Sequence, residues 1–222
     1  CMFLYFAKMG ERRFRDAGLV AAQHWMDVDI CHYSKDPLKM GGQVIHTTGH
    51  VTGGVTPSHE WTEGLLDFYH LTGKREAYDK AIGIADNVLR QLASPKFSKL
   101  GGSQARETGW AMRGLIAVYN ETKDEKYLDA CKLIAEQFLA WRAEYGSFLA
   151  PYTSHTQVRV PFMIAIAVNA LYRYYEATGD DRIPHLIVEE MGDVLDHCVL
   201  ADGRFFYKEL SSLHRRSDFT LQ

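Results

Sequence analysis

The sequence predicts an all-α fold built from consecutive antiparallel helical hairpins. A short turn, written Thr-Gly in its clearest copies, follows an apolar helical pattern four times. The connections inside the hairpins are short, and those between hairpins are long. Repeats of this length are typical of stacked hairpins whose neighbours bury each other's apolar faces. The four turns stand at Met9-Gly10, Thr72-Gly73, Thr122-Lys123 and Thr178-Gly179.

The first helix of each hairpin is recognised by residues at fixed distances before the turn. A tyrosine lies three positions before each threonine, and a small residue followed by leucine begins eight positions before it. The same count from Met9 makes residues 1–8 the remainder of a broken helix. The helix before Thr72 is predicted to start at Thr56-Pro57-Ser58, because a hydroxyl cap and a proline suit a first turn.

The second helix of each hairpin follows the turn and has its own apolar face. These helices are predicted at 12–28, 75–92, 125–144 and 182–200. Gly10 and Gly73 stand where a left-handed glycine closes a helix. The tail at 203–210 could begin a fifth hairpin or form a strand, and the sequence leaves both open.

Composition narrows the classes of partner. The formal net charge is −3, which gives no general argument for nucleic-acid or membrane binding, and no apolar run has the length of a membrane span. The four cysteines lack metal-type spacing and are expected to be buried thiols. We expect residues 1–222 to form a single domain taken from a longer chain with companion domains. The compartment, cytoplasmic or secreted, is left open.

The long connections, predicted at 30–59, 93–106 and 145–160, carry an unusual balance of charge. They hold six basic residues against one acid, Asp36, together with five of the ten histidines. Because alternation of short and long connections puts the long ones at one end, that end should attract an anionic ligand. The alternative is that these lysines are merely solvated. The basic residues are Lys35, Lys39, Lys96, Lys99, Arg106 and Arg159.

Aromatic side chains share these connections and the first helical turns that follow them. Aromatic faces stack on the apolar faces of sugar rings, so the mixture of rings and cations suits an acidic carbohydrate; core packing is the alternative for Trp61 and Trp110. We therefore expect an oligo- or polysaccharide substrate. The candidate substrate-binding residues are His59, Trp61, Arg106, Tyr152, His155 and Arg159.

Proton-transfer residues are predicted in the same segments. His46 or His50 would act as base or acid, since histidine titrates near neutrality, and Lys39 is an alternative base. Glu60, with Glu63 after it, would supply an acid for glycoside hydrolysis, or would simply favour a helix N-terminus. The histidines could instead hydrogen-bond loop backbone or hold a divalent cation, so the cofactor stays unknown.

Two motifs carry a family resemblance. The runs His24-Trp25-Met26-Asp27-Val28-Asp29 and His59-Glu60-Trp61-Thr62-Glu63-Gly64-Leu65-Leu66 resemble the exo-rhamnogalacturonan lyase-like proteins of the six-hairpin (α/α) toroid superfamily. The resemblance implies part of an (α/α) toroid and a lyase that cleaves galacturonate-containing pectic glycans by β-elimination. A full toroid has six hairpins, and this chain has fewer.

Other readings stay open beside the lyase. A six-hairpin glycoside hydrolase is the first alternative, and a non-catalytic carbohydrate-binding or helical-repeat interaction domain is the second. The resemblance to β-L-arabinofuranosidases with a cysteine-ligated zinc is poorer, because no cysteine cluster lies in the long connections.

Overall fold

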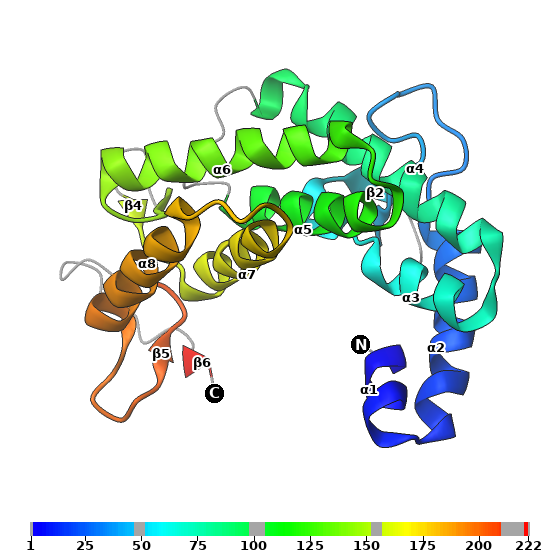
Figure 1. Ribbon diagram of the computed structural model, residues 1–222, viewed down its shortest axis with the longest axis horizontal. Helices are drawn as coiled ribbons and strands as arrows, with labels where there is room; N and C mark the ends of the chain where they lie inside the picture. Colours follow the sequence, from blue (N-terminus) through cyan, green and yellow to red (C-terminus); the bar gives the residue numbers. More distant parts are fainter. Residues whose placement is uncertain (1, 47–51, 98–104, 152–156, 210–219, 222) are drawn as a thin grey trace. The chain divides into compact units, whose positions relative to one another are not determined.

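The computed structural model describes residues 2–46, 52–97, 105–151, 157–209 and 220–221. Helices dominate it and follow one another as antiparallel pairs joined by short turns, so the predicted all-α hairpin fold is confirmed (Figure 1). None of the described helices is long and apolar enough to cross a membrane. The helices are α1 (Met2–Met9), α2 (Arg12–His24), α3 (Glu63–Thr72), α4 (Arg75–Leu92), α5 (Ala105–Thr122), α6 (Glu125–Tyr145), α7 (Pro161–Thr178) and α8 (Arg182–Cys198).

The repeated turn has a shared hydrogen-bond pattern that explains its sequence. Thr72 Oγ1 donates to the Phe68 carbonyl one turn back, and it accepts the N–H of Lys74 two residues on. Thr122 and Thr178 make the same pair of bonds. The next residue is left-handed in each copy, and glycine fills that position in two of the three because it has no Cβ to clash. One hydroxyl thus ends one helix and starts the next.

The chain divides into two compact units. The first comprises Cys1–Ser98 with Ala117–Tyr127, and the second comprises Lys99–Ile116 with Leu128–Gln222. In the first unit the core lies between α3 and α4, where Leu65, Ile84 and Val88 are fully buried. In the second unit α5 and α7 approach closely, because Gly109 faces the backbone of Ala167 without a side chain between them.

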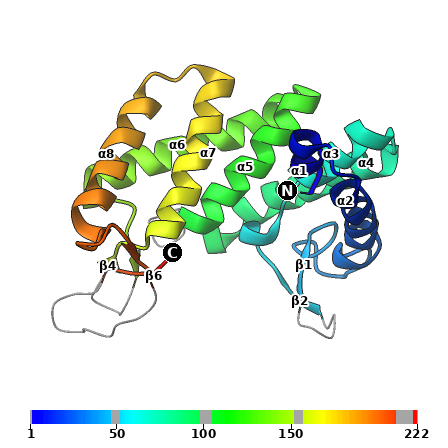
Figure 2. The same cartoon turned by 90° about the horizontal axis from the view of Figure 1, so that it is seen from below.

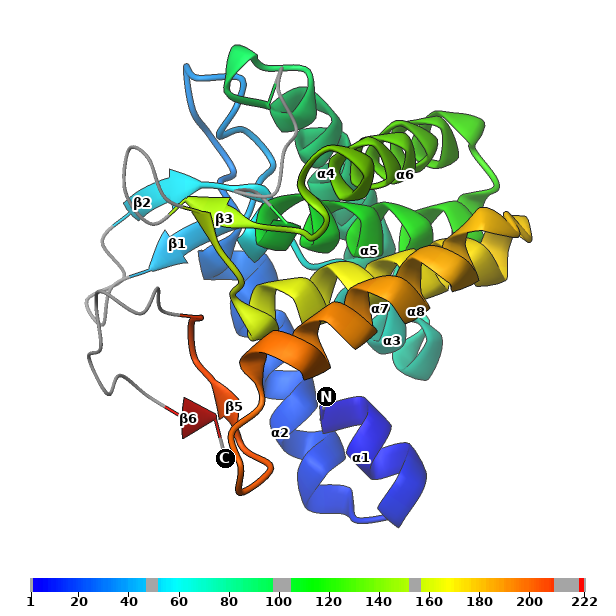
Figure 3. The ribbon, with the colours of Figure 1, turned by 90° about the vertical axis from the view of Figure 1, so that its left-hand side faces the viewer.

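Short antiparallel strand pairs interrupt the long connections. β1 (Val44–His46) pairs with β2 (Thr52–Val55), and this hairpin stands out from the helices of the first unit (Figure 2). In the second unit β3 (Ala150–Pro151) pairs with β4 (Gln157–Val158). β5 (Phe205–Phe206), which follows α8, pairs with β6 (Thr220–Leu221) (Figure 3). The tail left open in the sequence therefore contains a strand at Phe205–Phe206.

The helix before Thr72, α3, starts later than predicted. Thr56 precedes a single 3-10 turn, η2 (Pro57–His59), and α3 begins only at Glu63. Glu60 leaves the helical region of backbone space, with φ −97° and ψ 84°. Its side chain is directed to the backbone N–H of Gln43, directly before β1, so a tertiary contact overrides the local helix signal. At the end of α2, residues Trp25–Asp29 form a π-helical segment, η1.

Candidate active site

Glu60 is a buried carboxyl group that ties the start of α3 to β1. Its side chain is fully buried, and its two oxygens accept the backbone N–H of Gln43 at 3.0 and 3.1 Å. Burial raises the pKa of Glu60 to about 8, although the Gln43 hydrogen bond and the charge of Arg90 oppose the shift. Glu60 is therefore largely protonated at neutral pH and has no access to solvent.

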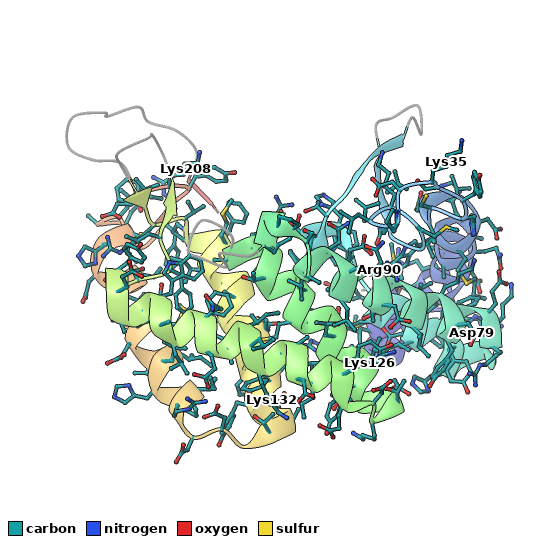
Figure 4. All side chains as sticks on the ribbon, turned by 90° about the horizontal axis from the view of Figure 1, so that it is seen from above. Lys35, Asp79, Arg90, Lys126, Lys132 and Lys208 are labelled. Carbon is teal, nitrogen blue, oxygen red and sulfur yellow. The ribbon has the colours of Figure 1, made fainter. Side chains whose placement is uncertain are left out.

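The connection that carries Lys39 is held by the C-terminal half of α4. Asn87 Nδ2 donates to the carbonyls of Leu38 and Met40 at 3.0 Å each, and Gln91 Nε2 donates to Leu38 at 2.5 Å. Arg90, which is labelled on α4 in Figure 4, donates to the Met40 carbonyl at 2.6 Å. These bonds satisfy loop carbonyls that would otherwise lack partners. Lys39 itself is exposed at the tip of the turn.

The partly exposed face of α3 carries a pair of carboxylates. Glu63 and Asp67 are four residues apart, which puts both on one face of the helix. Burial raises the pKa of Asp67, and the negative charge of Glu63 raises it further, while His70 opposes the shift. A carboxyl group with a raised pKa beside a second carboxyl group can act as an acid with its partner. The sequence indicated Glu63 but missed Asp67, although the i, i+4 spacing was visible.

Aromatic rings surround the first turn of α3. Trp25 packs against Gly64 so closely that a Cβ there would lie 3.0 Å from its ring. The rings of His59 and Trp61 are 5.8 Å apart and tilted, and His59 Nδ1 lies 3.0 Å from Ser58 Oγ. The predicted binding residues His59 and Trp61 are both partly exposed in this part of the first unit. Glycine at 64 thus lets an indole ring lie directly over the helix that bears Glu63.

The predicted histidines are only partly described by the structure. His46 ends β1, opposite Thr52, but its side chain lies outside the described part of the chain. His50, Tyr152 and His155 also lie outside the described residues. Their assigned roles stay predictions.

Arg159, predicted to bind a substrate carboxylate, already has two carboxylate partners in the second unit. Its Nε lies 2.5 Å from Asp193 Oδ2, and its Nη1 lies 2.8 Å from Glu209 Oε2. These contacts raise the pKa of Arg159 and hold β4 against the segment after α8. A substrate carboxylate would have to compete with both acids. Arg106, the other arginine among the predicted substrate-binding residues, is partly exposed in the first turn of α5.

A metal centre is not formed by the part of the chain that the structure describes. No three of its histidine, cysteine, aspartate and glutamate side chains gather in a way that could hold a metal ion. Cys131 and Cys198 are buried free thiols, as expected, and Cys31 is partly exposed. Burial raises the pKa of Cys198 to about 12. These residues therefore do not fit the zinc site implied by the arabinofuranosidase resemblance.

Comparisons with known proteins identify the family. Residues 44–209 match the family model described as β-L-arabinofuranosidase, GH127 catalytic domain. No curated protein matches the sequence. This match corrects the expectation from the sequence, which favours the exo-rhamnogalacturonan lyase-like proteins over the arabinofuranosidases because the long connections hold no cysteine cluster.

Solved structures agree on the fold. A GH76 α-mannanase of Bacteroides thetaiotaomicron superposes with a TM-score of 0.65 at 14% identity, covering 99% of this chain and 62% of its own. A GH76 mannosidase of the same organism gives 0.57 at 14% identity, covering 92% and 59%. The chain thus spans about three fifths of each neighbour. The predicted fold, helical hairpins that form part of an (α/α) toroid, is confirmed, and the chain belongs to the β-L-arabinofuranosidase family defined by the GH127 catalytic domain.

Proposed function

We propose that the protein is a glycoside hydrolase that releases arabinofuranosyl residues from glycans. The observation that carries the proposal is the match of residues 44–209 to the GH127 catalytic domain. The carboxylate pair of α3, with aromatic rings beside it, supports it from the chemistry. Glycosidases generally use two carboxyl groups, one to protonate the leaving oxygen and one as nucleophile or base.

Within this proposal Asp67 is the acid and Glu63 is its partner. The raised pKa of Asp67 favours the protonated form that can donate to a leaving oxygen. Side chains at i and i+4 have Cβ atoms about 5–6 Å apart, so their carboxyl groups can reach the separation of about 5 Å that retaining enzymes use. We therefore assign Glu63 as nucleophile and expect retention of anomeric configuration. Trp25 and Trp61 would stack on the sugar.

The predicted pectate-type lyase receives less support. β-Elimination needs a cation to offset the charge of a uronate carboxylate, and Arg159, one of the two arginines predicted to bind substrate, is paired with Asp193 and Glu209. The family match names a hydrolase. Hydrolysis is therefore proposed in place of elimination, and the two reactions give different products.

The test incubates the protein with aryl arabinofuranosides, arabinan, α-mannan and galacturonan. We expect free arabinose from the arabinofuranosides and no product that absorbs in the near ultraviolet. α-Mannan is included because both solved neighbours are GH76 proteins named for mannan or mannoside. Release of mannose alone would overturn the proposed sugar, and an unsaturated uronate product would overturn the proposed reaction.

A further inference from the structure

A buried acceptor on α4 lacks a hydrogen-bond partner. Asn87 is fully buried, and its Nδ2 group is used by the carbonyls of Leu38 and Met40. Its Oδ1 has no hydrogen-bond partner among the described residues. Buried polar atoms are nearly always paired, so this oxygen calls for a donor. The donor must come from a group close to the amide.

Gly42 shows that the Glu60 carboxyl group lies near this amide. A Cβ placed on Gly42 would lie 2.5 Å from Val55 Cγ1, 2.8 Å from Glu60 Oε1 and 2.9 Å from the Cγ of Asn87. The carboxyl group and the amide therefore converge on the same backbone position, from the start of α3 and from α4. The missing side chain at Gly42 leaves the space in which they can meet. A carboxylate has only acceptor oxygens, whereas a carboxylic acid carries one donor.

We propose that Glu60 is a positioning residue that donates a carboxyl proton to Asn87 Oδ1 and thereby clamps β1 onto α4. In this arrangement the Glu60 carboxyl group makes two kinds of hydrogen bond, because it accepts the backbone N–H of Gln43 and donates to the side-chain amide of Asn87. β1 begins directly after Gln43 and ends at His46. The clamp therefore fixes the base of the hairpin that carries the predicted proton-transfer histidines.

The surroundings of Glu60 favour its neutral form. Burial raises its pKa to about 8. Among the residues that the structure describes, the charge that acts on it is that of Arg90 of α4, whose guanidinium lowers the pKa but is bound to the Pro37 and Met40 carbonyls. Gln43 before β1, Val55 of β2 and Asn87 of α4 are uncharged. His59, the preceding residue, turns its ring to Ser58 and Trp61.

The clamp predicts how stability depends on pH. In the unfolded chain a glutamate loses its proton near its model value of 4.5, whereas folded Glu60 keeps it until about pH 8. The folded state thus binds one more proton than the unfolded state between pH 4.5 and about 8. The contribution of Glu60 to stability is therefore complete below pH 4.5 and is lost as pH rises to about 8. The folding equilibrium constant of the wild type should fall about tenfold per pH unit relative to Glu60→Gln.

Urea unfolding between pH 5 and 7 measures this slope. Glu60→Gln keeps an acceptor and a donor but cannot ionise, so its slope should lack the one-proton component. Gln91→Ala is the matched control, because it loses a bond to the same Leu38 carbonyl without touching the proton, and it should keep the wild-type slope. A Glu60→Gln slope equal to that of the wild type would overturn the proposal.

Infrared spectroscopy tests the partner of the proton. At pH 6 the wild type should show a protonated-carboxyl C=O band that is lost in Glu60→Gln and shifted in Asn87→Leu. An unshifted band in folded Asn87→Leu would overturn donation to Asn87. If Asn87→Leu does not fold, the wild type and Glu60→Gln are compared instead. Identical spectra in the protonated-carboxyl region would show that Glu60 is not protonated at pH 6 and would overturn the proposal. These readouts do not require activity, so the hydrolase proposal can fail separately.

Discussion

Replacing Arg159 by methionine should destabilise the second unit strongly, because it removes the cation that Asp193 and Glu209 share. The side chains of Arg159, Asp193 and Glu209 are only 17%, 12% and 27% exposed. Removing one partner of a buried ion pair costs about 3–5 kcal/mol, and the partial exposure here puts the expected loss at about 3 kcal/mol. Methionine keeps most of the stem's packing, so the change reports mainly on charge.

Urea unfolding at pH 7 measures the loss, with Arg204→Met as the matched control. Arg204 pairs with Asp202 at the surface, where the two side chains are 48% and 50% exposed. Such pairs contribute at most about 1 kcal/mol, so the two variants should differ by about 2 kcal/mol. Equal losses of unfolding free energy in the two variants would refute the conclusion that Arg159 is a structural cation held by Asp193 and Glu209.

The same pair predicts an acid-dependent difference. Burial pushes the pKa of Asp193 up, but the hydrogen bonds from Arg159 and Ser147 and the charges of Arg159 and His197 together outweigh burial and hold the pKa below the ordinary value of 3.8. The folded state therefore gains stability above 3.8, and that gain is lost as pH falls through the folded pKa. The gap between wild type and Arg159→Met should narrow in acid. A gap that widens in acid would contradict the assignment.

Two further stability predictions concern the second unit. Gly109→Ala should lower the free energy of unfolding by about 1–3 kcal/mol, because the new Cβ would lie 3.0 Å from the Ala167 backbone. Gly192→Ala, whose Cβ would have nothing within 4 Å, should raise it by up to about 1 kcal/mol. Changes of the same sign would refute the close approach of α5 and α7. Glu190→Ala should cost about 3 kcal/mol, because buried Glu190 accepts Ser147 Oγ–H and the N–H of Phe148 and pairs with Arg142. The exposed neighbour Glu189→Ala should cost less than about 1 kcal/mol, and parity between the two glutamates would contradict this account. Thermal or urea unfolding monitored by circular dichroism measures all four.

The hairpin array could be predicted because its signal is local. The Thr72 hydroxyl, its copies at Thr122 and Thr178, and the glycines after two of them act within a single turn of chain. Apolar periodicity then placed the second helices close to their observed bounds, as for Arg75–Leu92. The pair of β1 and β2 was missed because these strands are only three and four residues long and are held by pairing.

The candidate site could be predicted only in part, because burial and pairing are tertiary properties. Glu60 and Glu63 look alike in the sequence, yet one is fully buried against Gln43 and the other lies on a partly exposed face of α3. Arg159 looked free in a basic connection, while its partners Asp193 and Glu209 come from distant segments. Charge counts along the chain cannot distinguish a cation that binds substrate from one that holds the fold.

The central claim is that the carboxylates of α3 hydrolyse a glycosidic bond. The direct test is kcat/KM of Glu63→Gln and Asp67→Asn for arabinose release from an aryl arabinofuranoside, beside Asp129→Asn, which removes an exposed carboxylate paired with Lys132 on α6. We expect the two α3 variants to lose about a hundredfold or more and the control to keep the wild-type rate. Folded α3 variants that turn over the substrate at the wild-type rate would contradict the assignment.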